Sequence, residues 1–160
     1  MTRSRSLGLG ILALVSLVGC DHVTKHVAKV DLQGHPPKPM IGSLLDLRYV
    51  ENTDVAFNLM RAVPEKTRAP LLLISGLLGC ATLLTLLARR PRRPAVHAAL
   101  LLVAAGAIGN TLDRVARGYV VDFIHVPHWP VFNVADMCVS AGAMLIVWAT
   151  LRRPARPDPA

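Results

Sequence analysis

The sequence contains few aromatic residues. Phe, Trp and Tyr make up 4% of its 160 residues, although 52% of the chain is hydrophobic. The apolar residues are therefore mostly Leu, Val, Ala and Ile, which is more typical of a chain in lipid than of a soluble core. The mean hydropathy of +0.44 supports this interpretation, and the length suits a single domain over residues 1–160.

Cysteine is also scarce. The three cysteines, Cys20, Cys80 and Cys138, each lie in or beside an apolar run. Their odd number and irregular spacing indicate neither a disulfide framework nor a zinc site. Cys80 and Cys138 are typical of thiols that are buried as small hydrophobic side chains.

Acidic residues are fewer than basic ones. The chain has 10 Asp and Glu against 18 Lys and Arg, a formal charge of +8. Such an excess is common in nucleic-acid-binding proteins. Here, however, the arginines lie beside apolar runs, and the four in residues 89–94 are interspersed with two prolines and no aromatic residue. We therefore expect no nucleic-acid partner and interpret these arginines as markers of the cytoplasmic side of a membrane.

Four apolar segments are long enough to cross a bilayer, at about residues 7–28, 69–88, 95–113 and 134–151. Basic residues precede the first, separate the second from the third and follow the fourth. This pattern predicts that both termini are cytoplasmic and that the loops at 29–68 and 114–133 face outward. A proline-rich tail at 154–160 is predicted to be disordered. No internal repeat supports an inverted-repeat transporter.

The first segment has two interpretations. Arg3 and Arg5 precede an apolar stretch that ends in L-V-G-C at 17–20, the pattern of a bacterial lipobox with a lipidated Cys20. The alternative is an uncleaved helix that continues past Cys20. We favour the helix because Asp21 and Lys25, four residues apart, share a helical face and can pair.

The loop at 29–68 is predicted to hold a small sheet outside the bilayer. Residues 45–50 alternate between apolar and polar side chains, as a strand does, and residues 55–59 resume as a second strand. The prolines in residues 35–39 predict an extended connection, and Pro64 with Glu65 predicts the start of a helix. The fold class is therefore an all-α integral membrane protein with four transmembrane helices and a small sheet.

Polar residues gather at the outer ends of the predicted spans, where ionisable groups are costly and are retained mainly for function. Asp122 and Asp136 are each flanked by apolar residues, and partial burial favours one proton shared between two carboxylates. Such a pair can activate a water, with one carboxylate taking its proton and the other donating to a peptide carbonyl. Asp113, which lies beside Arg114 and four residues before Arg117, is typical of a structural ion pair.

Three other functions fit parts of this pattern. Asp122, His125, His128 and Asp136 are residue types that bind metals, although Pro127 keeps the two histidines off a regular helix. A lipidated Cys20 would indicate a lipoprotein without catalysis, and the same acidic residues suit a proton-coupled transporter. Sensitivity to chelators, an acylated N-terminus and substrate flux in sealed vesicles would identify these alternatives.

Five ordered motifs resemble those of the lipoprotein signal peptidase family, also called signal peptidase II. They are D-H-V-T-K at 21–25, N-T-D-V-A-F at 52–57, G-N-T-L-D-R at 109–114, V-V-D-F at 120–123 and F-N-V-A-D at 132–136. Each motif alone has modest specificity. Five in this order across nearly the whole chain are highly specific.

The resemblance implies an aspartic endopeptidase of the bacterial inner membrane that cuts prolipoproteins just before the diacylglyceryl-modified cysteine. It implies four membrane helices, a periplasmic sheet cradle, an active site facing the periplasm and membrane lipids as surroundings. We expect a monomer without a metal or cofactor. By resemblance, the catalytic residues are Asp122 and Asp136, and the substrate-binding residues are Asn52, Asn110, Arg114 and Asn133. The supporting residues are Asp21 and Lys25. We expect Asp113 to be a structural residue.

One position departs from the family pattern. The family usually shows N-x-G-x-A-F, and this chain has Asp54 in place of the glycine. A glycine there suggests a positive φ, and aspartate tolerates the left-handed region better than most residues. We therefore expect Asp54 to adopt left-handed geometry in a turn and to affect substrate preference as a third carboxylate near the site.

Overall fold

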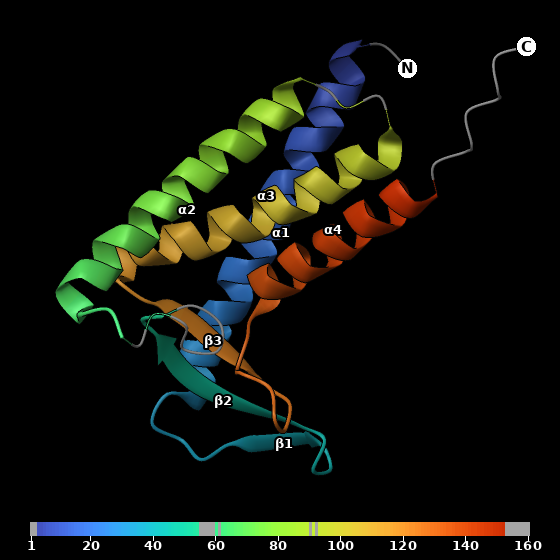
Figure 1. The fold of residues 1–160 in the computed structure, drawn as a ribbon. Helices are drawn as coiled ribbons and strands as arrows, with labels where there is room; N and C mark the ends of the chain where they lie inside the picture. The colour runs from blue at the N-terminus through green and yellow to red at the C-terminus, as the bar shows by residue number, and fades with distance from the viewer. Residues whose placement is uncertain (1–2, 55–59, 61, 90, 92, 153–160) are drawn as a thin grey trace, which may run out of the picture.

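The computed structural model describes residues 3–54, 60, 62–89, 91 and 93–152. Four helices and three strands follow one another along the chain (Figure 1). They are α1 (Arg3–Leu32), β1 (Lys38–Ile41), β2 (Leu45–Asn52), α2 (Glu65–Ala88), α3 (Pro94–Arg117), β3 (Val120–His125) and α4 (Val134–Leu151). All four helices are long and apolar enough to cross a membrane. The predicted fold class, a four-helix membrane protein with a small sheet, is confirmed.

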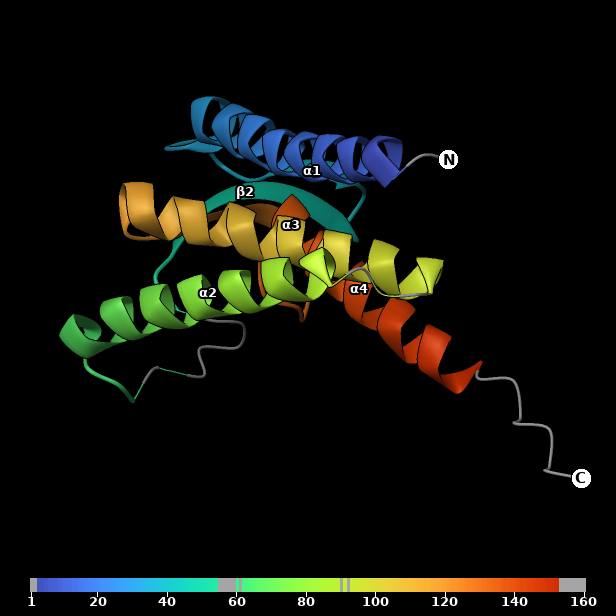
Figure 2. The same cartoon turned by 90° about the horizontal axis from the view of Figure 1, so that it is seen from above.

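Helix α3 is the centre of the bundle, because it packs against each of the other three helices (Figure 2). Its contact with α4 depends on small residues. A Cβ atom added to Gly142 of α4 would lie 2.7 Å from the Ala99 carbonyl oxygen, and one added to Gly106 of α3 would collide with the Ala135 carbonyl oxygen. Small residues let membrane helices approach closely, where packing takes the place of a hydrophobic driving force.

Helix α3 is longer than predicted at its C-terminal end. It ends at Arg117, and Gly118 follows in the left-handed conformation with a φ of 80°, a common way to end a helix. Asp113 and Arg114 therefore lie on the last turns of the helix, whereas the sequence placed Asp113 at its end and Arg114 in a loop. From there the Asp113 carboxylate accepts the backbone N–H of Val121 in the following segment, Val120–His125.

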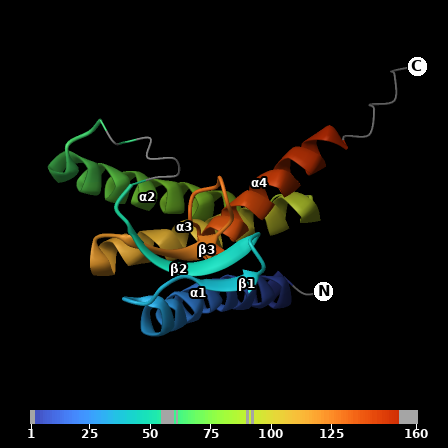
Figure 3. The ribbon, with the colours of Figure 1, turned by 90° about the horizontal axis from the view of Figure 1, so that it is seen from below.

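The sheet lies at the end of the bundle opposite the α2–α3 connection (Figures 1 and 3). It is antiparallel, in the order β1-β2-β3. The alternation at residues 45–50 correctly predicted β2. The sequence missed β3, and it assigned part of β1 to an extended connection; Pro39 is tolerated there because β1 is an edge strand. The second strand predicted at 55–59 and the tail predicted at 154–160 lie outside the described residues.

A small apolar core joins the sheet to the C-terminal end of α1. Ala28 and Leu32 of α1 are buried against Phe123 of β3, with Leu47 and Tyr49 of β2 packed beside them. This contact places β3 directly against the helices. Because side chains alternate along a strand, Asp122, next to Phe123, lies on the opposite face of β3.

Candidate active site

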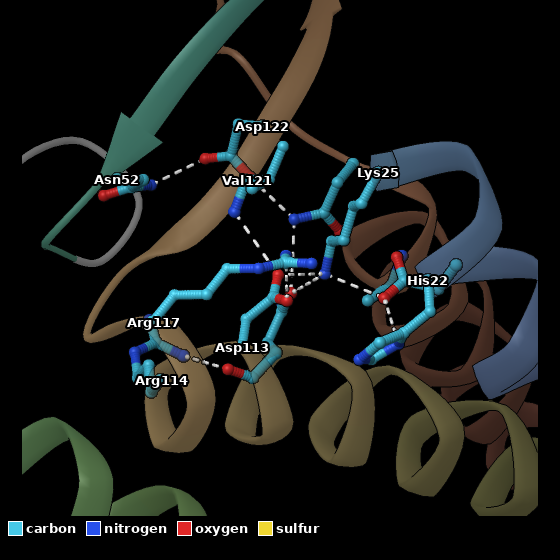
Figure 4. A network of polar contacts seen from close by, with 12 residues as sticks. His22, Lys25, Asn52, Asp113, Arg114, Arg117, Val121 and Asp122 are labelled. Carbon is cyan, nitrogen blue, oxygen red and sulfur yellow. Dashed lines mark hydrogen bonds and ion pairs between the residues drawn. The ribbon is translucent and has the colours of Figure 1, made fainter. Parts of the chain in front are cut away.

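A buried ion cluster joins α1 to α3 (Figure 4). The Lys25 ammonium lies 2.8 Å from Asp21 Oδ2 and 2.9 Å from Asp113 Oδ2, and all three side chains are at most 1% exposed. Asp113 Oδ1 lies 2.6 Å from the Arg117 guanidinium. The predicted pairing of Asp21 with Lys25 is present, and so is the pairing of Asp113 with Arg117.

The carboxylates of this cluster also hold the two segments that carry Asp122 and Asp136. Asp21 Oδ1 accepts the backbone N–H of Ala135, in the first turn of α4, at 2.8 Å. Asp113 Oδ2 accepts the backbone N–H of Val121, beside Asp122, at 3.3 Å. Asp21 reaches α4 because Gly109 lacks a side chain; a Cβ there would lie 2.6 Å from Asp21 Oδ2. The cluster thus sets the position of both carboxylates through the backbone.

Asp136 sits in the first turn of α4, in a capping box with Asn133. The Asn133 amide oxygen accepts the Asp136 N–H at 2.9 Å, and Asp136 Oδ2 accepts the Asn133 N–H at 3.2 Å. The second oxygen, Oδ1, accepts a bond from Asn110 Nδ2 at 2.8 Å. The spacing Asn-x-x-Asp before an apolar run is a helix-start signal that our sequence analysis did not use.

Asp122 lies on β3, and its two oxygens accept bonds from two amides. Asn52 Nδ2 donates to Oδ2 at 2.7 Å, and Asn133 Nδ2 donates to Oδ1 at 2.6 Å. Burial raises the pKa of Asp122 to about 6, and the nearby charge of Asp136 acts in the same direction, while the bonds from Asn52 and Asn133 oppose the increase. A raised pKa of this kind is suited to acid–base chemistry.

The amides connect the two carboxylates to each other and to the ion cluster. Asn133 Nδ2 also contacts Asn110 Oδ1 at 3.2 Å, and Lys25 donates to the same oxygen at 2.9 Å. Since Asn110 Oδ1 accepts from two donors, its NH₂ group must face Asp136. The orientation of Asn110 is thus set by Lys25, a residue of another helix.

Asp122 and Asp136 line one cavity of about 560 Å³ between the sheet, α3 and α4. Asn52, Asn110 and Arg114, three of the four predicted substrate-binding residues, line it as well. The fourth, Asn133, is fully buried and bonds to the two carboxylates from behind. The structure thus brings all six predicted catalytic and substrate-binding residues together.

Asp54 does not have the predicted left-handed geometry. Among the described residues, His128 is the one non-glycine residue with a positive φ, of 66°. The chain bends at Asp54 because its N–H donates to the Asn52 side-chain oxygen at 2.8 Å, a local turn that needs no positive φ. The Asp54 carboxylate is buried; Oδ1 accepts the Met60 N–H at 3.1 Å, and Oδ2 lies 3.3 Å from Arg68 Nη1. The pairing with Arg68 carries no local signal in the sequence.

The four residues considered as metal ligands are not gathered in one place. His125 Nδ1 lies 2.9 Å from Asp46 Oδ2 on the neighbouring strand, and strand alternation puts His125 on the opposite face from Asp122. Arg48 also holds the Asp46 carboxylate through two bonds, and Arg48 with His125 lowers the pKa of Asp46 to about 2. No three His, Cys, Asp or Glu side chains in the described part of the chain form a metal-binding group.

The fold and the cavity define a multi-pass membrane protein in which two carboxylates, one buried and one half-buried, face a common space. Residues 13–152 match the family described as Signal peptidase (SPase) II. The chain therefore belongs to the signal peptidase II family, which consists of aspartic peptidases. The family resemblance seen in the five motifs is confirmed.

Relatives and solved structures agree with this assignment. The chain is 36% identical to the lipoprotein signal peptidase of Moorella thermoacetica, covering 88% of this chain and 91% of the relative. It is 38% identical to that of Teredinibacter turnerae, covering 89% and 85%. Two solved structures described as bacterial membrane enzymes superpose with TM-scores of 0.79 and 0.80, at 25% and 27% identity. The two superpositions cover 95% and 92% of this chain, and each covers 95% of the solved structure.

Proposed function

We propose that this protein removes signal peptides from prolipoproteins by cutting just before the diacylglyceryl-modified cysteine, with Asp122 and Asp136 as the catalytic pair. The observation that carries the proposal is that two carboxylates 14 residues apart in sequence line one cavity, each held by amide donors. Family membership supplies the reaction class. The roles of the individual residues are our own assignment.

A water molecule between the two carboxylates would be the nucleophile. The ionised carboxylate takes a proton from the water as its oxygen attacks the peptide carbonyl carbon, and the protonated carboxyl donates to the carbonyl oxygen. When the C–N bond breaks, the amide nitrogen of the cysteine takes the proton that the first carboxylate gained from the water and leaves as the new N-terminus. The new carbonyl group returns its hydroxyl proton to the second carboxylate, which restores the pair. The two carboxylates share one proton at the start of the cycle, so the pair titrates as one unit.

The substrate has to bring a peptide to the carboxylates while its acyl chains stay in lipid. Arg114 and Asn52 line the cavity beside Asp122, and their donors suit peptide carbonyl oxygens. Met137 and Val139 of α4 form an apolar part of the same wall. We assign the peptide to the polar side and the diacylglyceryl group to the side toward α4.

The function is tested with two synthetic peptides that span a lipoprotein cleavage site and differ only in the diacylglyceryl group on cysteine. The purified protein in mixed lipid–detergent micelles should cut the modified peptide and leave the lipid-modified cysteine as its N-terminus, measured by mass spectrometry. A chelator should not change the rate. Equal cutting of the unmodified peptide, or full loss of activity with chelator, would contradict the proposal.

The proposed location is the bacterial inner membrane, with both termini cytoplasmic and the cavity facing the periplasm, as a monomer. The arginines of residues 89–94 support this orientation. In a background without native cysteines, Leu44→Cys in the exposed β1–β2 turn should react with an impermeant maleimide in cells whose outer membrane alone is permeabilised. Arg89→Cys should react only after the inner membrane is opened. The reverse pattern would contradict the orientation.

Removal of the Asn52 amide should change the pH dependence of cleavage. The bond from Asn52 lowers the pKa of Asp122, so Asn52→Ala should raise this pKa. The limb of the kcat/KM profile that reports Asp122 should then move to higher pH. Tyr49→Phe, on the same strand but bonded to Glu51, is the matched control. A limb that does not move in Asn52→Ala would show that Asn52 has no influence on Asp122.

A further inference from the structure

Asp54 and Arg68 form an ion pair that spans the connection from β2 to α2. Asp54 lies two residues beyond the end of β2, and Arg68 lies in the first turn of α2. Arg68 Nη1 is 3.3 Å from Asp54 Oδ2, and the two side chains are 16% and 7% exposed. Arg68 Nη2 also donates to the Val63 carbonyl at 3.0 Å. With the bond from the Met60 N–H to Asp54 Oδ1, these contacts tie both ends of the connection together. We call this pair the Asp54–Arg68 clasp.

The backbone of Asp54 contacts two residues of the candidate active site. Its N–H donates to Asn52 Oδ1 at 2.8 Å, and its carbonyl accepts from Arg114 Nη2 at 3.3 Å. Because the amide oxygen of Asn52 faces Asp54, its NH₂ group faces Asp122, where it donates to Oδ2 at 2.7 Å. The position of residue 54 therefore sets the orientation of Asn52, one of the hydrogen-bond donors to Asp122. It also provides a backbone acceptor for the Arg114 guanidinium.

The clasp comes from a residue in which this chain departs from the family motif. A glycine at this position would have no side chain, so it could not bond to Arg68 or to the Met60 N–H. Asp54 also lines the cavity that contains Asp122 and Asp136. Arg68 supplies a positive charge at this third carboxylate, which limits repulsion between the carboxylates of one cavity.

We propose that the Asp54–Arg68 clasp is a positioning device for catalysis in this chain: it holds the end of β2 so that Asn52 stays bonded to Asp122 and Arg114 stays in the cavity wall. The inference rests on the proposed function. Neither clasp residue needs to touch the reacting atoms. Loss of the clasp should therefore affect kcat and the pH profile, through Asn52, more than it affects folding.

The test measures kcat, KM and the pH profile with the diacylglyceryl peptide for four variants. Arg68→Ala removes the counter-charge; Asp54→Asn keeps an acceptor for the Met60 N–H but removes the charge. Both should lower kcat/KM by about tenfold, as expected for a partly buried charged bond, and should move the Asp122 limb as Asn52→Ala does. Arg68→Lys should retain most of the activity. Lys66→Ala, which removes an exposed charge two residues away, is the matched control.

If folded Arg68→Ala and Asp54→Asn show wild-type kinetics and a wild-type pH profile, the clasp has no positioning role. A lower thermal stability with unchanged kinetics of the folded fraction would overturn the proposal too, because that is the effect of a purely structural ion pair. If the wild type does not cut the peptide, or if the Asp122→Asn variant cuts it as well as the wild type does, the proposed function fails and this inference fails with it.

Discussion

Asp122→Asn and Asp136→Asn should each lower kcat/KM by roughly three orders of magnitude or more, and the double variant should be little worse, because members of one catalytic unit are not additive. Each substitution removes one of the two groups between which the proton must be exchanged. Cleavage of the diacylglyceryl peptide is the measurement.

The contacts of the two carboxylates also predict a cost in stability. Both oxygens of Asp122 accept bonds from amide NH₂ groups, so an asparagine there directs its own NH₂ group at another donor. One bond is lost, at about 1–3 kcal/mol. Folding must therefore be verified for both variants by size-exclusion chromatography and thermal unfolding.

Asp31→Asn is the matched control, since Asp31 is an exposed carboxylate in the last turn of α1. It should cut at the wild-type rate. Substantial cleavage by either single variant of the pair, with the protein folded and inserted, would end the aspartate-pair hypothesis.

Lys25→Met should have the largest effect on stability of any single substitution considered. It leaves the carboxylates of Asp21 and Asp113 buried without the ammonium group between them. Breaking a buried ion pair by removing one partner costs about 3–5 kcal/mol. Asn110 also loses the donor that orients it toward Asp136, so activity should fall in any protein that still folds.

The measurement is the temperature of half-unfolding in detergent, compared with Lys29→Met. Lys29 lies one turn further along α1 and is partly exposed, with no ion pair in the described structure. Adding Asp21→Asn to Lys25→Met should recover part of the loss, because Asp113 keeps Arg117 as its partner and the uncompensated charge of Asp21 is then removed. Equal stability of Lys25→Met and Lys29→Met would show that the cluster contributes little to the fold.

The sequence by itself determined the features that depend on local spacing. A charge-free run of 20 residues is long enough to span a bilayer whatever surrounds it, so residues 69–88 predicted most of α2. Alternation predicted β2, and the four-residue spacing of Asp21 and Lys25 predicted their pairing. The family motifs, which occur in order, identified the residues that converge on the cavity.

Only the tertiary structure decided which partner each polar group has. Asp21 accepts the N–H of Ala135, 114 residues away, and Asn52 donates to Asp122, 70 residues away. The strands β1 and β3 are short, so their pairing depends on neighbours and not on an extended pattern. The φ of Asp54 was predicted wrongly for a local reason, because its N–H bonds to the Asn52 side chain two residues away. The partner of its carboxylate, Arg68, depends instead on the packed fold. Such bonds form only once the helices and the sheet have brought distant donors and acceptors within about 3 Å of each other.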